Sequence, residues 1–262
     1  MSPSDRYRVT LGAIERMTPT VKSYTFAFEP GIKFSFKPGQ FVRLFVPKEG
    51  KLTDKPYSIA SPPGQERQIE LCVKRIEKGY VSTYLDQLTG GESLEMSGPI
   101  GKFHLKEPVD SDLVFLATGT GVVPFRSMLR GLFPIEPDHA PWAPYQFHAD
   151  PARPLPAGQA GAGGRQVWLF LGVRHEDEIL YESEFRRMAE RYPAFHFIPT
   201  ISRPRSWQGA TGYVQEQAAK QLQASPDKQI YVCGLLPMIE GARAALKGMG
   251  FPREQIHYEI YT

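Results

Sequence analysis

The sequence predicts two domains, an antiparallel β-barrel with one short helix followed by an α/β domain with a parallel sheet. The N-terminal part holds short β-forming runs separated by Gly and Pro turns, which is typical of a barrel or sandwich. From about residue 110, apolar runs alternate with helical segments, which indicates a parallel sheet. A length of 262 residues suits two domains of moderate size. We place them at 1–108 and 109–262.

In the N-terminal domain, strands are expected at residues 24–28, 40–46 and 69–73. Residues 24–28 alternate with a period of two, and the other two runs are apolar and rich in β-formers. One helix is expected at about 82–88, with Ser82 as its N-cap.

In the C-terminal domain, residues 113–117 form a continuous apolar run, as a strand buried on both faces should. The further expected elements are a helix ending near residue 132, strands at 167–171, 196–200 and 230–233, and helices at about 183–191, 213–222 and 237–249. A Pro/Gly-rich insertion at about 134–165 has no periodicity and is interpreted as a surface excursion. A lid or docking arm is the alternative, because the insertion contains several aromatic residues.

Composition excludes several classes of protein. Lys and Arg total 31 against 28 Asp and Glu, and a net charge of +3 does not indicate a nucleic-acid partner. No run approaches the ~20 apolar residues of a membrane span, and no signal region is present. Cys72 and Cys233 lack metal-ligand spacing, so we expect no metal site and two buried thiols in a cytoplasmic protein, with a disulfide as the less favoured alternative.

The segment Thr118-Gly119-Thr120-Gly121 follows the buried strand and opens a helix. Glycines there let the backbone approach a pyrophosphate, and a helix start supplies free N–H donors. Pro124 stands where the GxGxxG fingerprint has its third glycine. By itself the segment therefore leaves nucleotide binding and an ordinary strand-to-helix turn equally open.

A second segment combines a cation, an aromatic ring and a hydroxyl in Lys55, Tyr57 and Ser58. A flavin needs a counter-charge for its phosphate, a flat surface against its ring and a hydrogen-bonding group near N5, and these side chains can supply all three. The structural alternative is an edge strand with ordinary polar alternation.

Together with further motifs, these segments resemble the ferredoxin–NADP reductase family from about residue 36 to the C-terminus. The motifs occur in family order at residues 55–58, 71–75, 79–82, 97–102, 119–126, 233–238 and 259–262. Two departures stand out. Lys55 replaces the family's arginine and lacks its bidentate fork, and Thr262 follows the terminal Tyr261.

The resemblance implies FAD in the first domain. Tyr57 would stack on the flavin ring, Ser58 would hydrogen-bond near N5, and Lys55 would face the phosphate. Ser82 would cap the helix that receives the pyrophosphate. The other FAD-binding residues implied are Pro56, Cys72, Val73, Lys74, Gly79, Tyr80 and Val81.

The resemblance also implies a nicotinamide nucleotide in the second domain. Cys233 would pack beside the nicotinamide, Glu259 would relay a proton or hold the ring geometry, and Tyr261 would cover the flavin. With Ser58, these three form the implied catalytic set. The implied nucleotide loop contributes Thr120, Gly121, Pro124 and Gly234.

The choice between NADPH and NADH rests on Ser202 and Arg203, which follow a strand, and on Tyr213 ten residues further on. An arginine pairs well with a phosphate dianion, so this arrangement favours NADP(H). The alternative is a generic turn that NAD(H)-using members of the superfamily share.

These observations predict a monomeric reductase that transfers hydride between NADPH and FAD and exchanges single electrons with ferredoxin or flavodoxin. The alternative enzyme is an NAD(P)H-dependent reductase component of an oxygenase electron-transfer chain. A non-enzymatic redox sensor is less favoured, because Cys233, Glu259 and Tyr261 are all present.

Overall fold

The structure is a computed structural model that describes residues 6–133, 135 and 165–261. It forms two compact units, which are treated separately. The first unit comprises Met1–Leu105 and Val123–Gly131, and the second comprises Lys106–Val122 and Leu132–Thr262. The chain leaves the first unit close to the predicted boundary, but it returns there for one helix. The predicted insertion lies outside the described residues, apart from residues 135 and 165.

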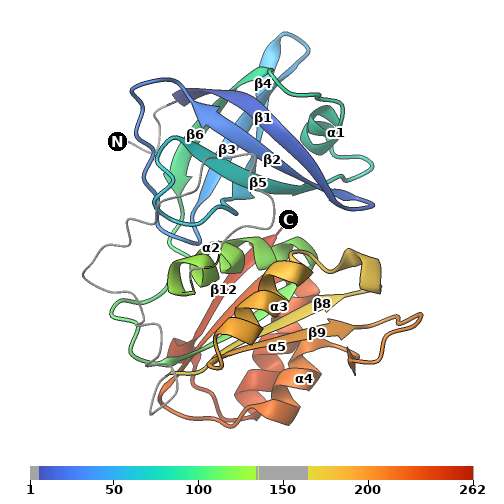
Figure 1. Cartoon of the computed structure of the whole chain (residues 1–262). Coiled ribbons are helices and arrows are strands. Elements are labelled where there is room, and N and C mark those ends of the chain that lie inside the picture. The colour runs from blue at the N-terminus through green and yellow to red at the C-terminus, as the bar shows by residue number, and fades with distance from the viewer. Residues whose placement is uncertain (1–5, 134, 136–164, 262) are drawn as a thin grey trace. The chain divides into compact units, whose positions relative to one another are not determined.

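The first unit is an antiparallel sheet with strand order β4-β3-β6-β1-β2-β5, which confirms the predicted class (Figure 1). Just beyond the end of β4, an antiparallel bridge between Ile59 and Leu71 pairs the chain with β5 and closes the sheet on itself. The predicted strands correspond to β2, β3 and β5, whereas β1 and β6 were missed. The strands are β1 (Arg6–Thr18), β2 (Val21–Phe28), β3 (Phe41–Lys48), β4 (Lys51–Ser58), β5 (Gln68–Lys74) and β6 (Ser93–Ile100).

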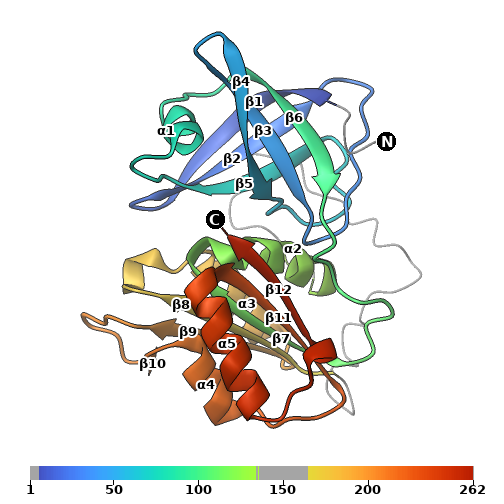
Figure 2. The same ribbon diagram turned by 180° about the vertical axis from the view of Figure 1, so that it is seen from behind.

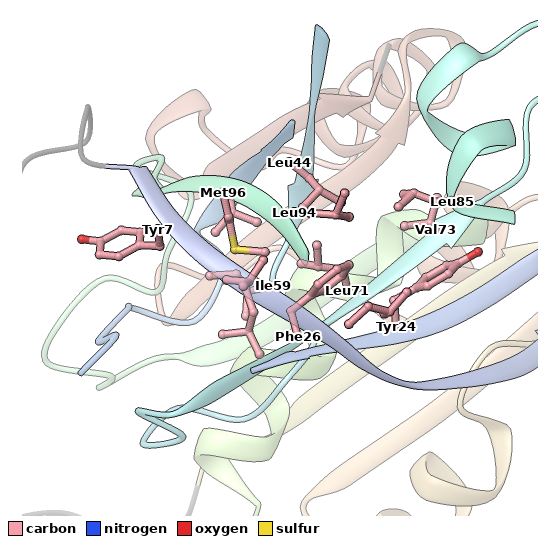
Figure 3. Packing of buried hydrophobic residues seen from close by; sticks show 14 of the residues in the cluster. Tyr7, Tyr24, Phe26, Leu44, Ile59, Leu71, Val73, Leu85, Leu94 and Met96 are labelled. Atoms are coloured by element: carbon pink, nitrogen blue, oxygen red, sulfur yellow. The ribbon is translucent and has the colours of Figure 1, made fainter. Parts of the chain in front are cut away.

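Alternating side chains build the core of this sheet. Along β2, Tyr24 and Phe26 are buried in one core cluster with Leu71 of β5, which pairs with Tyr24, and with Met96 of β6 (Figure 3). Each fully buried side chain of this size contributes about 1.5–3 kcal/mol relative to exposure. The buried face therefore sets the register of the strands, including β4, which carries the predicted flavin segment.

Helix α1 (Tyr80–Asp86) begins earlier than predicted, and its N-cap is Gly79 instead of Ser82. The prediction was wrong because Ser82 already lies inside the first turn. Its hydroxyl donates to the Gly79 carbonyl at 3.1 Å and accepts the Ile76 N–H at 3.1 Å. Ser82 therefore fixes the preceding turn and does not cap the helix.

Helix α2 (Val123–Leu132) is held to the first unit by a buried charged side chain. Arg126 donates to a Glu70 carboxylate oxygen at 2.6 Å and to the Ala60 carbonyl at 3.1 Å. Only 10% of the Arg126 side chain and 20% of the Glu70 side chain are exposed. Ser127 adds a hydrogen bond to the Ser61 carbonyl at 2.7 Å. The polar face of α2 thus holds the chain just beyond β4.

The second unit is a parallel sheet with strand order β10-β9-β8-β7-β11-β12, as predicted. Helix α3 (Glu182–Arg191) covers one face, and α4 (Val214–Gln221) and α5 (Leu236–Gly248) cover the other (Figures 1 and 2). The edge strands β10 and β12 were not predicted. The strands are β7 (Asp112–Thr118), β8 (Val167–Val173), β9 (Phe195–Ile201), β10 (Ala210–Thr211), β11 (Lys228–Leu235) and β12 (Ile256–Tyr261).

Replacing Glu70 by Gln should destabilise the first unit, because it puts a neutral amide in place of the carboxylate that faces the buried Arg126 charge. We expect the free energy of unfolding to fall by about 2–3 kcal/mol. Urea denaturation followed by circular dichroism measures this change. The matched control is Glu95→Gln, which removes the exposed partner of Arg6. The control should change stability by about 0.5 kcal/mol or less. Equal effects of the two variants would contradict a dominant role of the buried pair.

Candidate functional site

Strand β4 presents the predicted flavin residues on the first unit. Lys55 is exposed, Tyr57 is half-buried against the core, and Ser58 is buried. Burial raises the pKa of the Tyr57 phenol to about 12, so the ring stays neutral at physiological pH. A neutral, partly exposed aromatic ring is a surface on which a flat heterocycle can stack.

The other predicted flavin residues lie on β5 and around the start of α1. The Cys72 and Val73 side chains are buried, so any contact that they make with a cofactor runs through the backbone. Lys74 is exposed at the end of β5. At the helix, Val81 is buried, whereas Tyr80 is 42% exposed and donates its hydroxyl to the Pro47 carbonyl at 2.7 Å.

In the second unit, the loop after β7 and the end of β11 approach each other backbone to backbone. A Cβ at Gly121 would lie 2.2 Å from the Cys233 carbonyl oxygen. A Cβ at Gly234 would lie 2.5 Å from the Thr118 hydroxyl, and Gly234 has a φ of +156°. Both glycines are buried and neither position has room for a side chain, so glycine is needed there for the turn after β7 to pack against the end of β11.

The nucleotide loop differs from its prediction in one respect. Gly119–Val122 forms a single 3-10 turn before α2 begins at Val123. Gly119 has a φ of +51°, in the left-handed region that glycine enters at little cost. Thr120 and Gly121 therefore belong to a tight turn, and Pro124 lies in the first turn of the following helix.

Cys233, Glu259 and Tyr261 come together at the carboxyl end of the parallel sheet. Cys233 on β11 is directly opposite Glu259 on β12, and Leu235 is opposite Tyr261. Burial raises the pKa of the Cys233 thiol well above its usual value, and the Glu259 charge raises it further. A hydrogen bond with Tyr261 opposes this shift. Cys233 is therefore a neutral thiol at physiological pH.

Ser202 and Arg203 lie at the end of β9 and continue its pairing with β8. The Ser202 N–H donates to the Val173 carbonyl at 3.0 Å, and the Arg203 N–H donates to the Arg174 carbonyl at 2.8 Å. Arg174, Arg203 and Arg205 are all exposed. They follow the ends of the neighbouring parallel strands β8 and β9, where the acidic residues Glu176–Glu178 also lie.

Arg174 and Arg205 were missed from the sequence, although a signal for Arg174 existed. It directly follows the buried strand β8, and parallel strands end at the same edge of a sheet. Tyr213 is the N-cap of α4 and is 60% exposed, so its ring is available for stacking.

Metal-ligating side chains do not cluster anywhere in the described part of the chain. In the same described residues, no helix has the length and apolar character needed to cross a membrane.

Comparisons with known proteins fit this geometry. Residues 8–105 match the oxidoreductase FAD-binding domain family, and residues 115–244 match the oxidoreductase NAD-binding domain family. A ferredoxin–NADP reductase B from Sorangium cellulosum is 31% identical, and the alignment covers 100% of both chains. The chain belongs to the ferredoxin–NADP reductase family.

Other members of this family are components of oxygenase systems. The reductase component of phenol 2-monooxygenase from Pseudomonas sp. is 28% identical over 99% of this chain and 67% of that protein. The electron transfer component of 2-halobenzoate 1,2-dioxygenase from Burkholderia cepacia is 30% identical over 95% of this chain and 66% of that protein. The chain thus spans about two thirds of the length of these relatives.

Solved structures share the fold. A cytochrome P450 reductase from Amycolatopsis superposes with a TM-score of 0.80 at 24% identity, covering 98% of this chain and 70% of that one. A ferredoxin NADP+ reductase from Neisseria gonorrhoeae superposes with a TM-score of 0.76 at 20% identity, covering 98% and 99%.

This reductase family member is an oxidoreductase with an FAD-binding and a nicotinamide-nucleotide-binding domain. The residues present fit both groups. In the first domain, Tyr57 offers a neutral ring beside the exposed cation Lys55. In the second, a glycine turn leads from the buried strand β7 into α2, and the exposed Arg203 and Tyr213 offer a cation for a phosphate and a ring for stacking.

Replacing Gly121 by Ala should disrupt the nucleotide loop, because the added methyl group meets the Cys233 main chain, which has no flexible end to move. We expect a loss of about 2–3 kcal/mol in stability and weaker nucleotide binding, measured by thermal unfolding and by calorimetric titration. The control is Gly248→Ala on α5, where no atom lies within 4 Å of an added Cβ. If Gly121→Ala leaves the melting temperature and the nucleotide affinity unchanged, the loop can shift to accommodate the methyl group and the prediction is wrong.

The Cys233 thiol should resist ionisation. In a Cys72→Ser background, absorbance at 240 nm should show Cys233 still protonated at the pH near 8.5 where an ordinary cysteine is half-ionised. Because the Glu259 charge raises this pKa, Glu259→Gln should move the onset of ionisation to lower pH. Half-titration of Cys233 at or below pH 8.5 in the otherwise unchanged protein would disprove the burial argument.

Proposed function

We propose that this protein transfers hydride between NADPH and FAD and exchanges single electrons with ferredoxin or flavodoxin, acting as a monomer. The observation that carries the proposal is the group formed by Cys233, Glu259 and Tyr261 beside the packed glycines Gly121 and Gly234. A protein that only bound the nucleotide would not need Cys233, Glu259 and Tyr261, the residues proposed to act in hydride transfer. The full-length similarity to a ferredoxin–NADP reductase supports the same conclusion.

The chain's own residues would bind and orient the two cofactors, which supply the redox chemistry when bound. Tyr57 would provide the stacking surface for the flavin, and Ser58 would place a hydroxyl near its reactive edge. Lys55 would neutralise phosphate charge from the exposed face of β4.

At the nicotinamide, Cys233 would contribute a compact and uncharged contact surface, because its thiol stays protonated. Glu259 would orient the ring or hold a proton at its carboxylate. Tyr261, which hydrogen-bonds with Cys233, would cover the flavin until the nicotinamide replaces it. Alignment of reacting groups in this way lowers the entropic barrier to the reaction.

We infer NADPH as the preferred nucleotide from the charges at the ends of β8 and β9. Arg203 would bind the 2′-phosphate with Ser202, and Arg174 and Arg205 add positive charge nearby. Tyr213 would stack on the adenine. Arginine suits this task because its guanidinium can donate two parallel hydrogen bonds to a phosphate.

The second candidate function is that of an NAD(P)H-dependent reductase component in an oxygenase electron-transfer chain. The observation that favours it is the similarity of the chain, over 95–99% of its length, to two such components. The same flavin and nicotinamide residues would serve either acceptor.

The test is a kinetic comparison of protein reconstituted with FAD. Under anaerobic conditions, NADPH should bleach the flavin absorbance, and wild-type kcat/KM should be higher for NADPH than for NADH. Arg203→Ala should lower kcat/KM for NADPH about 10- to 100-fold, equivalent to ~1.4–2.8 kcal/mol, with little effect on NADH. Lys220→Ala, which removes an exposed cation at the far end of α4, is the control.

A wild-type preference for NADH would support the oxygenase reading and overturn the NADPH assignment. Colourless protein that neither takes up FAD nor oxidises NADPH with an artificial acceptor would overturn both functions.

A further inference from the structure

A single carboxylate from the loop after β8 holds the loop that carries the arginines. Regular strand pairing ends at Arg203, whose N–H donates to Arg174, and the next residue is Pro204, which has no N–H to donate. Beyond this point, the Glu176 side chain replaces the strand as the hydrogen-bond acceptor. Its Oε1 accepts the N–H of Arg205 at 2.7 Å and the N–H of Ser206 at 2.9 Å. One oxygen atom therefore fixes two successive peptide groups.

These backbone N–H groups keep the carboxylate ionised. The pKa of Glu176 falls to about 2, because its charge is stabilised by its own N–H and by those of Ser206 and Arg205. Glu176 thus remains an acceptor throughout the physiological range of pH.

His175 supports the same loop from the adjacent position. Its Nδ1 lies 2.8 Å from the Arg203 carbonyl oxygen. Because a carbonyl oxygen only accepts, Nδ1 must carry the proton in this contact. The backbone at Arg174 is fixed in the same manner, because a Glu178 carboxylate oxygen accepts the Arg174 N–H at 3.0 Å.

Glu176 and Glu178 accept hydrogen bonds from backbone N–H groups of the arginine-carrying segments. The arginine side chains themselves stay at the surface. Arg174 and Arg203 are exposed, and Asp177 lies 3.7 Å from the Arg205 guanidinium. An arginine on a fixed backbone loses less conformational freedom when it binds a phosphate than one on a free loop. Glu176 can therefore promote anion binding even though it is itself an anion.

We propose that Glu176 is a positioning residue for recognition of the nucleotide 2′-phosphate, acting by fixing the backbone of the loop at 203–206. This inference rests on the proposed function, in which Arg203 binds that phosphate. It predicts an effect that depends on the hydrogen-bond acceptor of Glu176 and not on its charge.

The test compares Glu176→Ala, which removes the acceptor, with Glu176→Gln, whose amide oxygen can accept both N–H groups without a charge. Binding of 2′,5′-ADP and of 5′-AMP is measured by calorimetry, which needs no electron transfer. Glu176→Ala should weaken 2′,5′-ADP binding about tenfold and 5′-AMP binding less than about twofold. Glu176→Gln should stay within about threefold of wild type for both ligands.

Two controls accompany these variants. Glu182→Gln removes a nearby surface carboxylate that pairs with Arg186 on α3, and it should leave both affinities unchanged. Arg203→Ala tests the proposed function itself, because it removes the side chain proposed to bind the 2′-phosphate.

In steady-state kinetics, Glu176→Ala should raise KM for NADPH while kcat at saturating NADPH stays within about twofold.

The outcomes separate the two ideas. If Arg203→Ala weakens 2′,5′-ADP binding and Glu176→Ala does not, the inference is overturned and the proposed function stands. If Arg203→Ala has no effect, the NADPH assignment fails and this inference fails with it. Tighter 2′,5′-ADP binding by both Glu176 variants would show that the carboxylate acts only as a repelling charge. Equal weakening of 2′,5′-ADP and 5′-AMP would show a general structural role, and either result overturns the proposal.

Discussion

The buried ion pair between Arg126 and Glu70 is the contact on which the arrangement of the first unit depends. It satisfies a guanidinium that is nine-tenths buried, and through the Ala60 carbonyl it holds the chain just beyond β4. Ser23 completes the arrangement by donating to the other Glu70 oxygen at 2.8 Å. Since β4 carries Lys55, Tyr57 and Ser58, the polar face of one helix helps to set where these side chains lie.

In the second unit, the dominant constraint is the close packing of main-chain segments, whereas in the first unit it is a buried ion pair. The end of β11 and the turn after β7 meet at glycines, so the position of this turn and the burial of Cys233 result from the same packing. The parallel register then sets Glu259 beside Cys233. A parallel sheet gathers the ends of successive strands on one edge, and this explains why residues far apart in the sequence meet there.

The fold class followed directly from the sequence because hydrophobic period and turn residues are local signals. The strands β2, β5 and β7 show this clearly. The edge strand β12 was recognised only as a motif, since its half-exposed residues carry no core pattern. Ser82 was misassigned because a serine near a helix start resembles a cap unless the position of the helix is known.

Within the candidate site, the sequence singled out Arg203 but not Glu176 or Arg174. Motif matching finds residues that touch a ligand, whereas Glu176 acts through backbone N–H groups about 30 residues away, contacts that only the folded chain reveals. The Glu70 contact is of the same kind. Long-range pairs between ordinary charged residues leave no local pattern in a sequence.

The path of the chain between the units has a consequence for how the molecule can be divided. The polypeptide leaves the first unit after Leu105, returns for Val123–Gly131 and leaves again. No single cut therefore yields two intact modules, since a fragment ending near residue 105 would lack α2 and would leave the Glu70 carboxylate without Arg126. Recombination between relatives that exchanged only the first hundred residues would have to preserve Arg126 in the other parent. Helix α2 packs with the first unit but lies in the sequence between two segments of the second. Sequence changes in the two domains are therefore not independent of each other.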